Sequence, residues 1–177
     1  MSKNKNDLQL IAETPFLRLV QRERWSFAQR PQEISVVAIV AVTHDNKLVL
    51  VEQYRPPTDS RVIELPAGLA GDISGKEDET LQTAAARELL EETGYTAENW
   101  KQLATVVSSA GLTDEKITVF LASTLTKAGE GGGDESEDIT VHEIPLDQAE
   151  HWLAEQAKNH RDIDGRVFAA LHWAKAV

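Results

Sequence analysis

Three glutamates in the middle of the chain, Glu88, Glu91 and Glu92, have the i, i+3 and i+4 spacing of residues on one face of a helix. Like charges at these spacings destabilise a helix unless a positive group offsets them. Carboxylate oxygens are also the ligands that Mg²⁺ and Mn²⁺ prefer in proteins. The spacing therefore predicts a site for a divalent cation. Arg87 is expected to neutralise and orient these carboxylates through Glu91 or Glu79.

A Glu-Glu pair taken alone is more often a solvated helix face, so the surrounding residues must distinguish the two interpretations. The segment Arg87-Glu88-Leu89-Leu90-Glu91-Glu92-Thr93-Gly94-Tyr95 follows Glu79 by eight residues, and Leu65-Pro66-Ala67-Gly68 lies upstream. This pattern resembles the Nudix box, G-x5-E-x7-R-E-U-x-E-E-x-G-U, where U is an aliphatic or bulky apolar residue. The departure is at the front: Gly68 lies eleven positions before Glu79 instead of six. The five extra residues lengthen the loop that enters the helix, and loops tolerate additions at small entropic cost.

The resemblance implies a fold, a reaction and a cofactor. The fold is α+β, a Nudix-type α/β/α sandwich with a mixed β-sheet. The reaction is hydrolysis of a nucleoside diphosphate linked to a further group, with Mg²⁺ or Mn²⁺ neutralising charge and activating water. Glu88, Glu92 and Arg87 would be catalytic, and Glu88, Glu91 and Glu92 would bind metal. The backbone carbonyl of Ala67 could add a ligand, because Pro66 and Gly68 are expected to hold an irregular turn.

A second acidic segment lies later in the chain, at Gly132-Gly133-Asp134-Glu135-Ser136-Glu137-Asp138-Ile139-Thr140-Val141. It resembles the mobile acidic loop of the ADP-ribose pyrophosphatase branch. By register, Glu135 would be the general base and Glu137 a metal-linked carboxylate. The glycines would let the loop close over substrate. The alternative is an acidic tether without a catalytic role.

Residues for the substrate come from the same resemblance. Gln53-Tyr54-Arg55-Pro56-Pro57 is similar to the ADP-ribose and ADP-sugar pyrophosphatases, and Arg55 would grip a phosphate through paired donors. Trp25 and Arg30 match positions that hold the adenine end, although Trp25 could equally be a core or interface aromatic. Glu115 would meet a ribose hydroxyl. The segment from Ile163 to Phe168 resembles the start of the final helix of these enzymes.

One departure concerns the choice of sugar. ADP-ribose enzymes usually carry a proline about fifteen residues past the box, whereas this chain has Ala110 within Ser109-Ala110-Gly111-Leu112. Alanine lacks the fixed φ of proline, so the loop could be shaped for another sugar. The leading hypothesis is Mg²⁺-dependent hydrolysis of ADP-ribose or a related nucleoside diphosphate sugar to AMP and a sugar phosphate. The alternatives are a GDP-mannose or other sugar-nucleotide pyrophosphatase, and a non-catalytic module that senses nucleotide sugars.

Composition limits the remaining possibilities. The 177 residues fit a single Nudix hydrolase domain, residues 1–177, in which about 1–33 would form N-terminal strands for dimerisation and substrate binding. The formal net charge of −11 argues against a nucleic-acid surface. No apolar run reaches the roughly 20 residues needed to span a membrane. The chain has no cysteine, and its first residues lack the apolar core of a signal peptide, so we expect a cytoplasmic address. The family resemblance also suggests a homodimer.

The hydrophobic pattern predicts the elements that must position these residues. Residues up to about Glu13 are polar and expected to be loose. The predicted strands are Phe16–Val20, Arg24–Phe27, Ile34–Val42, Lys47–Tyr54, Arg61–Leu65, Leu103–Val107, Ile117–Ala122 and Ile139–Ile144. The strand Ile34–Val42 is rich in β-branched residues and nearly all apolar, so it should be buried on both faces. Helices are predicted from about Glu79 to Thr93, from Leu146 to Gln156 and from about Ile163, the last with Val167, Ala170, Leu171 and Ala174 on its core face.

Overall fold

The computed structural model describes residues 8–30, 34–71, 78–133 and 138–175. A small sheet is formed by the N-terminal strands β1 (Gln9–Glu13), β2 (Arg18–Arg22) and β3 (Trp25–Gln29). A larger mixed sheet and three helices form the body. These elements are β4 (Ser35–Val42), β5 (Lys47–Arg55), β6 (Ser60–Glu64), β7 (Ala67–Ala70), α1 (Leu81–Thr93), β8 (Tyr95–Val107), β9 (Lys116–Lys127), β10 (Thr140–Pro145), α2 (Ala149–Lys158), β11 (Asp162–Ile163) and α3 (Gly165–Ala174).

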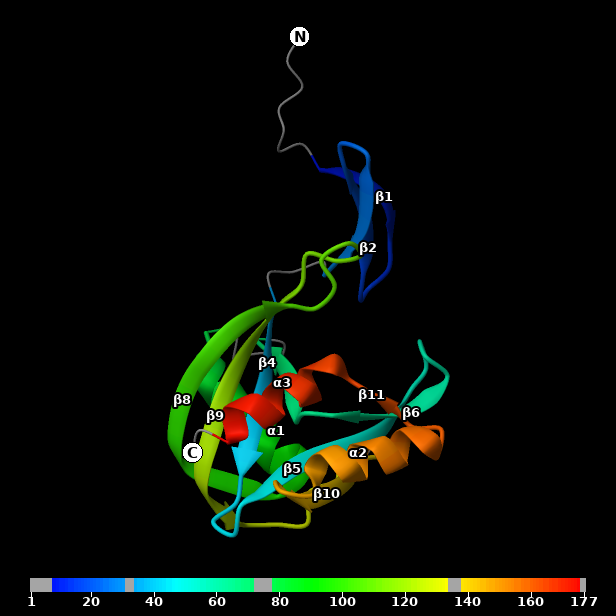
Figure 1. Ribbon diagram of the computed structural model, residues 1–177. Coiled ribbons are helices and arrows are strands. Elements are labelled where there is room, and N and C mark those ends of the chain that lie inside the picture. Colours follow the sequence, from blue (N-terminus) through cyan, green and yellow to red (C-terminus); the bar gives the residue numbers. More distant parts are fainter. Residues whose placement is uncertain (1–7, 31–33, 72–77, 134–137, 176–177) are drawn as a thin grey trace.

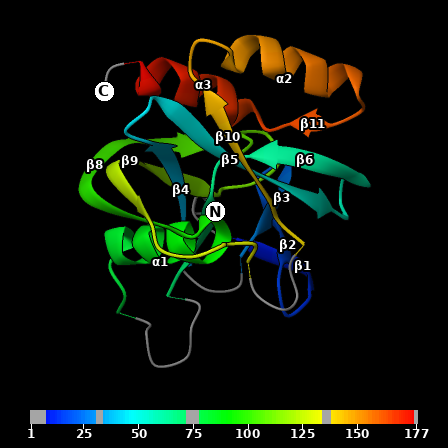
Figure 2. The same ribbon diagram turned by 90° about the horizontal axis from the view of Figure 1, so that it is seen from below.

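The larger sheet lies between two layers of helices. Helix α1 covers one face, and α2 and α3 cover the other (Figures 1 and 2). The main strand order is β11-β6-β5-β4-β9-β8, with β10 paired to β5 and β7 paired to β4. The β4–β9 and β11–β6 pairs are parallel, and the other pairs are antiparallel. This arrangement confirms the predicted α+β sandwich with a mixed sheet.

Strand β4 is the centre of the body because it contributes to both cores. Its successive side chains point to opposite faces, as the period of a β-strand requires. Val36, Ala38 and Val40 pack in the core under α2 and α3. Val37 and Ile39 pack in the core under α1. The uninterrupted apolar run from Val36 to Val42 is therefore buried on both faces, as predicted.

The pairing of β4 changes along its length, and this change opens the sheet. Near its end β4 pairs with β5 through Ala41 and Val42 only. Over Ser35–Ala38 its partner on that side is β7 instead. The first half of β4 is thus separated from β5 by an inserted short strand. Residues of β5, β6 and β7 line a cavity in this region.

Helix α1 has clear signals at both ends. The side chain of Thr80 accepts a hydrogen bond from the Thr83 N–H at 3.1 Å, which makes Thr80 the N-cap. Gly94 ends the helix with φ of 71°, a left-handed conformation that favours glycine. The predicted end is confirmed. The predicted start near Glu79 is two residues early because Thr80 supplies the cap.

Two other predictions from the sequence are wrong in their local structure, and a third gives only part of a longer strand. The polar segment through Glu13 contains β1, which pairs with β2 and so satisfies its backbone. The expected irregular turn after Pro66 is strand β7, paired to β4 through residues that include Ala67 and Gly68. The strand predicted to start at Leu103 is the second half of β8, which starts at Tyr95 and has a register shift after Gln102.

The N-terminal sheet projects from the body and touches it at one loop. Figure 1 shows β1 and β2 extending away from the sandwich. The Ala28 N–H donates to the Leu112 carbonyl at 2.8 Å, and Gln29 donates to Asp114 at 2.6 Å. These bonds join β3 to the loop between β8 and β9. In the described part of the chain, none of the helices is both long and apolar enough to cross a membrane.

Candidate active site

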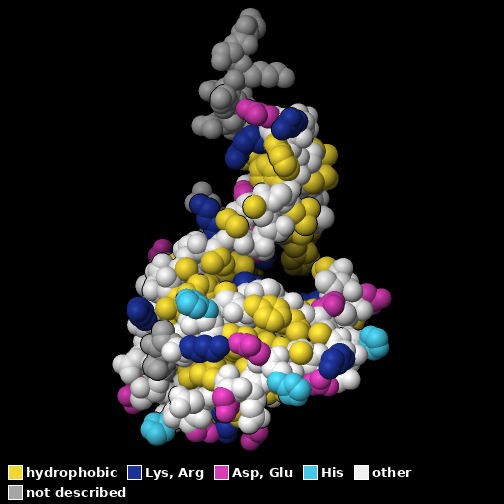
Figure 3. Space-filling model, viewed as in Figure 1, with side chains coloured by type: hydrophobic (Ala, Val, Ile, Leu, Met, Phe, Trp, Pro, Cys, Tyr) yellow, Lys and Arg dark blue, Asp and Glu magenta, His cyan; other side chains and the backbone are white. Residues whose placement is uncertain are grey.

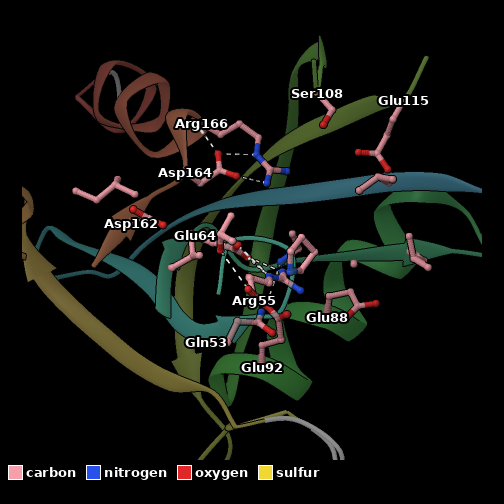
Figure 4. Close-up of a pocket in the computed structure, with 18 of the residues that line it drawn as sticks. Gln53, Arg55, Glu64, Glu88, Glu92, Ser108, Glu115, Asp162, Asp164 and Arg166 are labelled. Carbon is pink, nitrogen blue, oxygen red and sulfur yellow. Dashed lines mark hydrogen bonds and ion pairs between the residues drawn. The ribbon is translucent and has the colours of Figure 1, made fainter. Parts of the chain in front are cut away.

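Two of the predicted metal ligands, Glu88 and Glu92, line one cavity of about 920 Å³. Both belong to α1, and the cavity wall opposite the helix is made by β5, β6 and the segment before α3 (Figure 4). Glu92 is 3% exposed, and its Oε2 accepts a hydrogen bond from the Ala67 N–H at 3.0 Å. The last turn of α1 is thereby fixed to the start of β7. Ala67, which was also predicted to contribute, lines the same cavity.

Gly68 explains how the carboxylate of Glu88 comes so close to the backbone of β7. A Cβ atom at position 68 would lie 2.0 Å from both Cδ and Oε1 of Glu88. Such an approach is possible only when the residue has no side chain. The Glu88 carboxylate therefore occupies the space where a side chain at position 68 would lie. This contact brings together the first glycine of the sequence pattern and its second glutamate.

Arg87 lies behind the carboxylates and holds them together. Its guanidinium donates to Glu88 at 2.8 Å, to Glu91 at 3.0 Å and to the Leu69 carbonyl at 2.9 Å. Glu79 accepts two longer bonds of 3.4 Å. Burial by itself would lower the pKa of Arg87, but the bonds to Glu79 and the neighbouring glutamate charges raise it instead. Arg87 is thus a permanent cation that ties α1 to β7. Both ion-pair partners expected from the sequence, Glu79 and Glu91, are present.

Arg55 and Arg30 face the carboxylate helix across the cavity, and each is paired with a glutamate. Arg55 bonds Glu64 at two points, with Nε–Oε1 of 3.0 Å and Nη2–Oε2 of 2.5 Å. Glu64 is buried behind it, so the guanidinium is the part of the pair that meets the cavity. Arg30 pairs with Glu115 at 2.8 Å between Nη2 and Oε1. The structure thus brings Arg30, Arg55 and Glu115 together around the same space.

A third pair in the cavity, Arg166 with Asp164, was not chosen as a site from the sequence. Asp164 caps α3 by accepting from the Arg166 N–H at 2.7 Å, and its carboxylate also bonds the Arg166 guanidinium at two points. An aspartate at a helix N-cap usually serves the helix alone. The sequence feature that could have identified this pair is the arginine two residues after the aspartate. Both side chains belong to the start of α3, and both line the cavity. Glu64 was missed as well. It is an acid at the end of an apolar strand, directly before Leu65-Pro66.

Two described residues of the prediction, Glu91 and Trp25, are not among those that line this cavity. Glu91 is half exposed and its carboxylate pairs with Arg87. Trp25 lies on the projecting sheet and is 56% exposed. Glu135 and Glu137 lie outside the described residues. Among the residues that are described, no three Asp, Glu or His side chains converge closely enough to form a metal cluster. Of the three helix carboxylates, Glu88 and Glu92 line the cavity, whereas Glu91 does not.

The comparisons with known proteins agree with the geometry. The NUDIX domain family matches residues 32–170, which include both cavity walls. The chain belongs to the Nudix family. Among solved structures, the Nudix chain resembles the crystal structure of an ADP compounds hydrolase, with a TM-score of 0.71 and 23% identity over 99% of this chain and 97% of that one. This likeness concerns the fold.

Two curated relatives of this Nudix chain are more similar in sequence. A methanol dehydrogenase activator of Bacillus methanolicus is 38% identical over 138 residues, which cover 77% of this chain and 70% of the relative. An ADP-ribose pyrophosphatase of Bacillus subtilis (strain 168) is 38% identical over 114 residues, or 64% of this chain and 59% of the relative. Less than two thirds of the Bacillus subtilis protein is therefore covered by the match.

The residues of this Nudix site fit a divalent cation. ADP-ribose pyrophosphatases of the family are generally dependent on divalent metals. Here Glu88 and Glu92 offer hard oxygen donors from one wall. The described lining has six carboxylates against three arginines, a formal charge of −3, with Glu64, Glu88, Glu92, Glu115, Asp162 and Asp164 facing Arg30, Arg55 and Arg166. A diphosphate entering such a lining is repelled unless cations accompany it.

Glycines fix the segment that leads to the predicted base. The N–H of Gly132 donates to the Glu92 carbonyl at 2.8 Å, and the N–H of Gly133 donates to the Glu91 carbonyl at 3.0 Å. Gly131 has φ of 75°, and a Cβ there would lie 2.4 Å from the Thr93 carbonyl carbon. These glycines satisfy the free carbonyls at the end of α1. The chain is therefore attached to the carboxylate helix directly before position 134.

Proposed function

We propose that this Nudix protein hydrolyses the diphosphate bond of ADP-ribose or a related nucleoside diphosphate sugar with Mg²⁺ or Mn²⁺, giving AMP and a sugar phosphate. The observation that carries the proposal is the cavity itself. It combines two helix carboxylates, Glu88 and Glu92, with the cavity-facing guanidinium of Arg55. Its volume of about 920 Å³ lies in the usual range for small-molecule sites. The Bacillus subtilis relative is named for the same reaction.

The residues suggest a division of roles across the cavity. A bound divalent cation would be held by Glu88 and Glu92, with the Ala67 backbone and Glu137 as further ligands, and would neutralise charge on the diphosphate. Glu91 would join these ligands only by turning its exposed carboxylate away from Arg87. Arg55 would orient the diphosphate from the other side through its guanidinium. Because Glu64 fixes that guanidinium at two points, little side-chain entropy is lost on binding.

Hydrolysis also needs a group that accepts a proton from the attacking water. We assign this role to Glu135, which follows the glycines bonded to the end of α1. The water oxygen forms a bond to one phosphorus as the bridging oxygen leaves with the other phosphate. The proton passes to Glu135 and then to solvent. With ADP-ribose the products are AMP and ribose 5-phosphate. Arg87 would act without touching substrate, by keeping Glu88 in place.

We also propose that residues 1–177 act as one catalytic unit that pairs with a second copy through its N-terminal sheet. Large apolar side chains are exposed on this sheet and on the residues next to its strands; they are Leu8, Leu10, Ile11, Phe16, Leu17, Leu19 and Trp25. Figure 3 shows patches of hydrophobic surface, in yellow, on this projecting part of the molecule. Exposed apolar patches of this kind mark interaction sites. A second copy would cover them and bring Trp25 towards a cavity. Sedimentation should show a dimer at micromolar concentration, and Leu10→Glu should shift it to monomer.

A substrate panel tests the proposed reaction. ADP-ribose, ADP-glucose, GDP-mannose and dinucleoside polyphosphates would be incubated with the protein, with and without Mg²⁺, and the products separated by chromatography. We expect AMP and ribose 5-phosphate from ADP-ribose only when the metal is present. Faster cleavage of GDP-mannose would favour the alternative sugar. Tight binding of a nucleotide sugar without cleavage of any compound would favour a sensing module.

A further inference from the structure

We propose that Arg166 and Asp164 form the subsite for the vicinal diol of the terminal sugar, the one beyond the diphosphate. This inference rests on the proposed function and deepens it. The pair lies at the start of α3, on the wall opposite the carboxylates of α1, and lines the same cavity as Glu88, Glu92 and Arg55 (Figure 4).

The pair is held rigidly by its backbone. The Asp164 N–H donates to the Ile63 carbonyl at 3.0 Å, which fixes the residue to β6. Its Oδ1 accepts from the Arg166 N–H at 2.7 Å and from Nε at 2.8 Å, and its Oδ2 pairs with Nη2. Two of the three guanidinium nitrogens of Arg166 are thus used. Among the described residues Nη1 has no hydrogen-bond partner, and in Figure 4 this nitrogen points away from Asp164.

The Arg166–Asp164 pair differs from the Arg55–Glu64 pair in how much of each side chain is exposed. Arg55 is 42% exposed while its partner Glu64 is 7% exposed, so a ligand meets mainly a cation there. Arg166 is 26% exposed and Asp164 is 20% exposed, so a ligand meets a donor and an acceptor side by side. A phosphate would be repelled by Asp164. Two neighbouring hydroxyls match the pair, because one can accept from Nη1 while the other donates to the carboxylate.

The position of the pair indicates which sugar it would bind. The other mixed pair, Arg30 with Glu115, lies next to the loop that contacts β3 and the arm carrying Trp25. In Figure 4 Asp164 and Glu115 are both seen above Arg55, Asp164 towards the left and Glu115 towards the right. The two mixed pairs therefore occupy different parts of the cavity above Arg55. With the nucleoside on the side of the arm, Arg166 and Asp164 face the other sugar.

Burial and charge keep Arg166 suited to this role. Burial alone would lower the pKa of its guanidinium, but the bonds and charge of Asp164, with the charges of Glu64 and Glu115, raise it. Asp164 is held ionised, because its bonds to Arg166 outweigh the effect of burial and lower its pKa. Donor and acceptor therefore both persist across the neutral pH range.

The test compares two substrates that differ only in the terminal sugar: ADP-ribose and the methyl ester of ADP, which keeps the diphosphate and lacks the diol. Arg166→Met retains the length of the side chain but removes the donors. We expect kcat/KM for ADP-ribose to fall about 10- to 100-fold, the cost of losing a hydrogen bond to a charged group. For the methyl ester it should stay within about threefold of wild type. Lys175→Met, an exposed change on the same helix, should alter neither value.

A second variant guards against loss of folding. Arg166→Lys keeps the charge beside Asp164 but cannot donate to the carboxylate and the diol from one planar group, so it should show the same selective loss. An equal loss on both substrates in either variant, or no loss on ADP-ribose, would overturn the diol assignment. If wild-type protein with Mg²⁺ cleaves no nucleoside diphosphate sugar of the substrate panel, the proposed function itself fails, and this inference fails with it. If it cleaves another sugar nucleotide of the panel but not ADP-ribose, that compound and the methyl ester of its nucleoside diphosphate replace the ADP pair in the same comparison.

Discussion

The close contact between Gly68 and the Glu88 carboxylate allows the carboxylate site to be tested by a substitution that adds only one methyl group. In Gly68→Ala the new Cβ would lie 2.0 Å from Cδ and Oε1 of Glu88, whereas ordinary contact begins near 3.4 Å. The carboxylate must therefore move by about 1.4 Å. Metal ligands have to stay within about 0.2 Å of their ideal distances. A displacement of about 1 Å in a catalytic group can cost about 10²-fold in rate.

We therefore expect Gly68→Ala to lower kcat on the preferred substrate about 10²-fold, equivalent to about 2.7 kcal/mol in the activation free energy. The Mg²⁺ concentration needed for half-maximal rate should also rise. The fold should be retained, because φ of Gly68 is not positive and alanine suits a strand. Steady-state kinetics over a Mg²⁺ titration, with thermal unfolding measured in parallel, gives both results.

Gly129→Ala is the matched control. It also adds a methyl group to a glycine without positive φ, but nothing lies within 4 Å of the new Cβ. It should leave kcat and the Mg²⁺ requirement unchanged. If Gly68→Ala retains the wild-type kcat and metal dependence, Glu88 does not need the position that the structure gives it. The assignment of this carboxylate to the metal would then be refuted.

Three further predictions concern other glutamates of the chain. Glu92→Gln should abolish Mg²⁺-dependent turnover yet keep the fold, because an amide oxygen can still accept from Ala67; wild-type rates at saturating Mg²⁺ would contradict its role. Glu135→Gln should lower kcat by about 10²- to 10⁴-fold if this residue is the base, and an unchanged kcat would move the base elsewhere. Glu52 is buried, and although burial alone would raise its pKa, bonds to His142 and Arg61 lower it. Its stabilisation is therefore complete above about pH 5 and lost as pH falls through the lowered pKa. Urea unfolding should show Glu52→Gln less stable than wild type by about 1–3 kcal/mol at pH 7, with the difference shrinking below about pH 4; a constant difference would refute the linkage.

Local sequence patterns correctly predicted those features that depend on a single helix or strand. The β-branched run of β4 and the core face of α3 are buried as predicted, because strand and helix periods are fixed by backbone geometry. The same rule placed Glu88 and Glu92 on one face of α1, and Gly94 marked the helix end. The Nudix pattern depends on such short-range spacings. Family and fold could therefore be predicted from the sequence.

Tertiary structure decided which charged groups share the cavity. Asp164 and Arg166 lie more than seventy residues after the carboxylates of α1 in the chain. No local sequence pattern could predict that residues so far apart in the chain line the same cavity. They meet the others because β11 pairs with β6 and β7 separates β4 from β5. The direction of the Glu91 carboxylate could not be predicted from helical spacing either, because it is set by the hydrogen bond from Arg87. Spacing along the chain determines which face of an element a residue occupies, whereas the pairing of distant strands determines what that face meets.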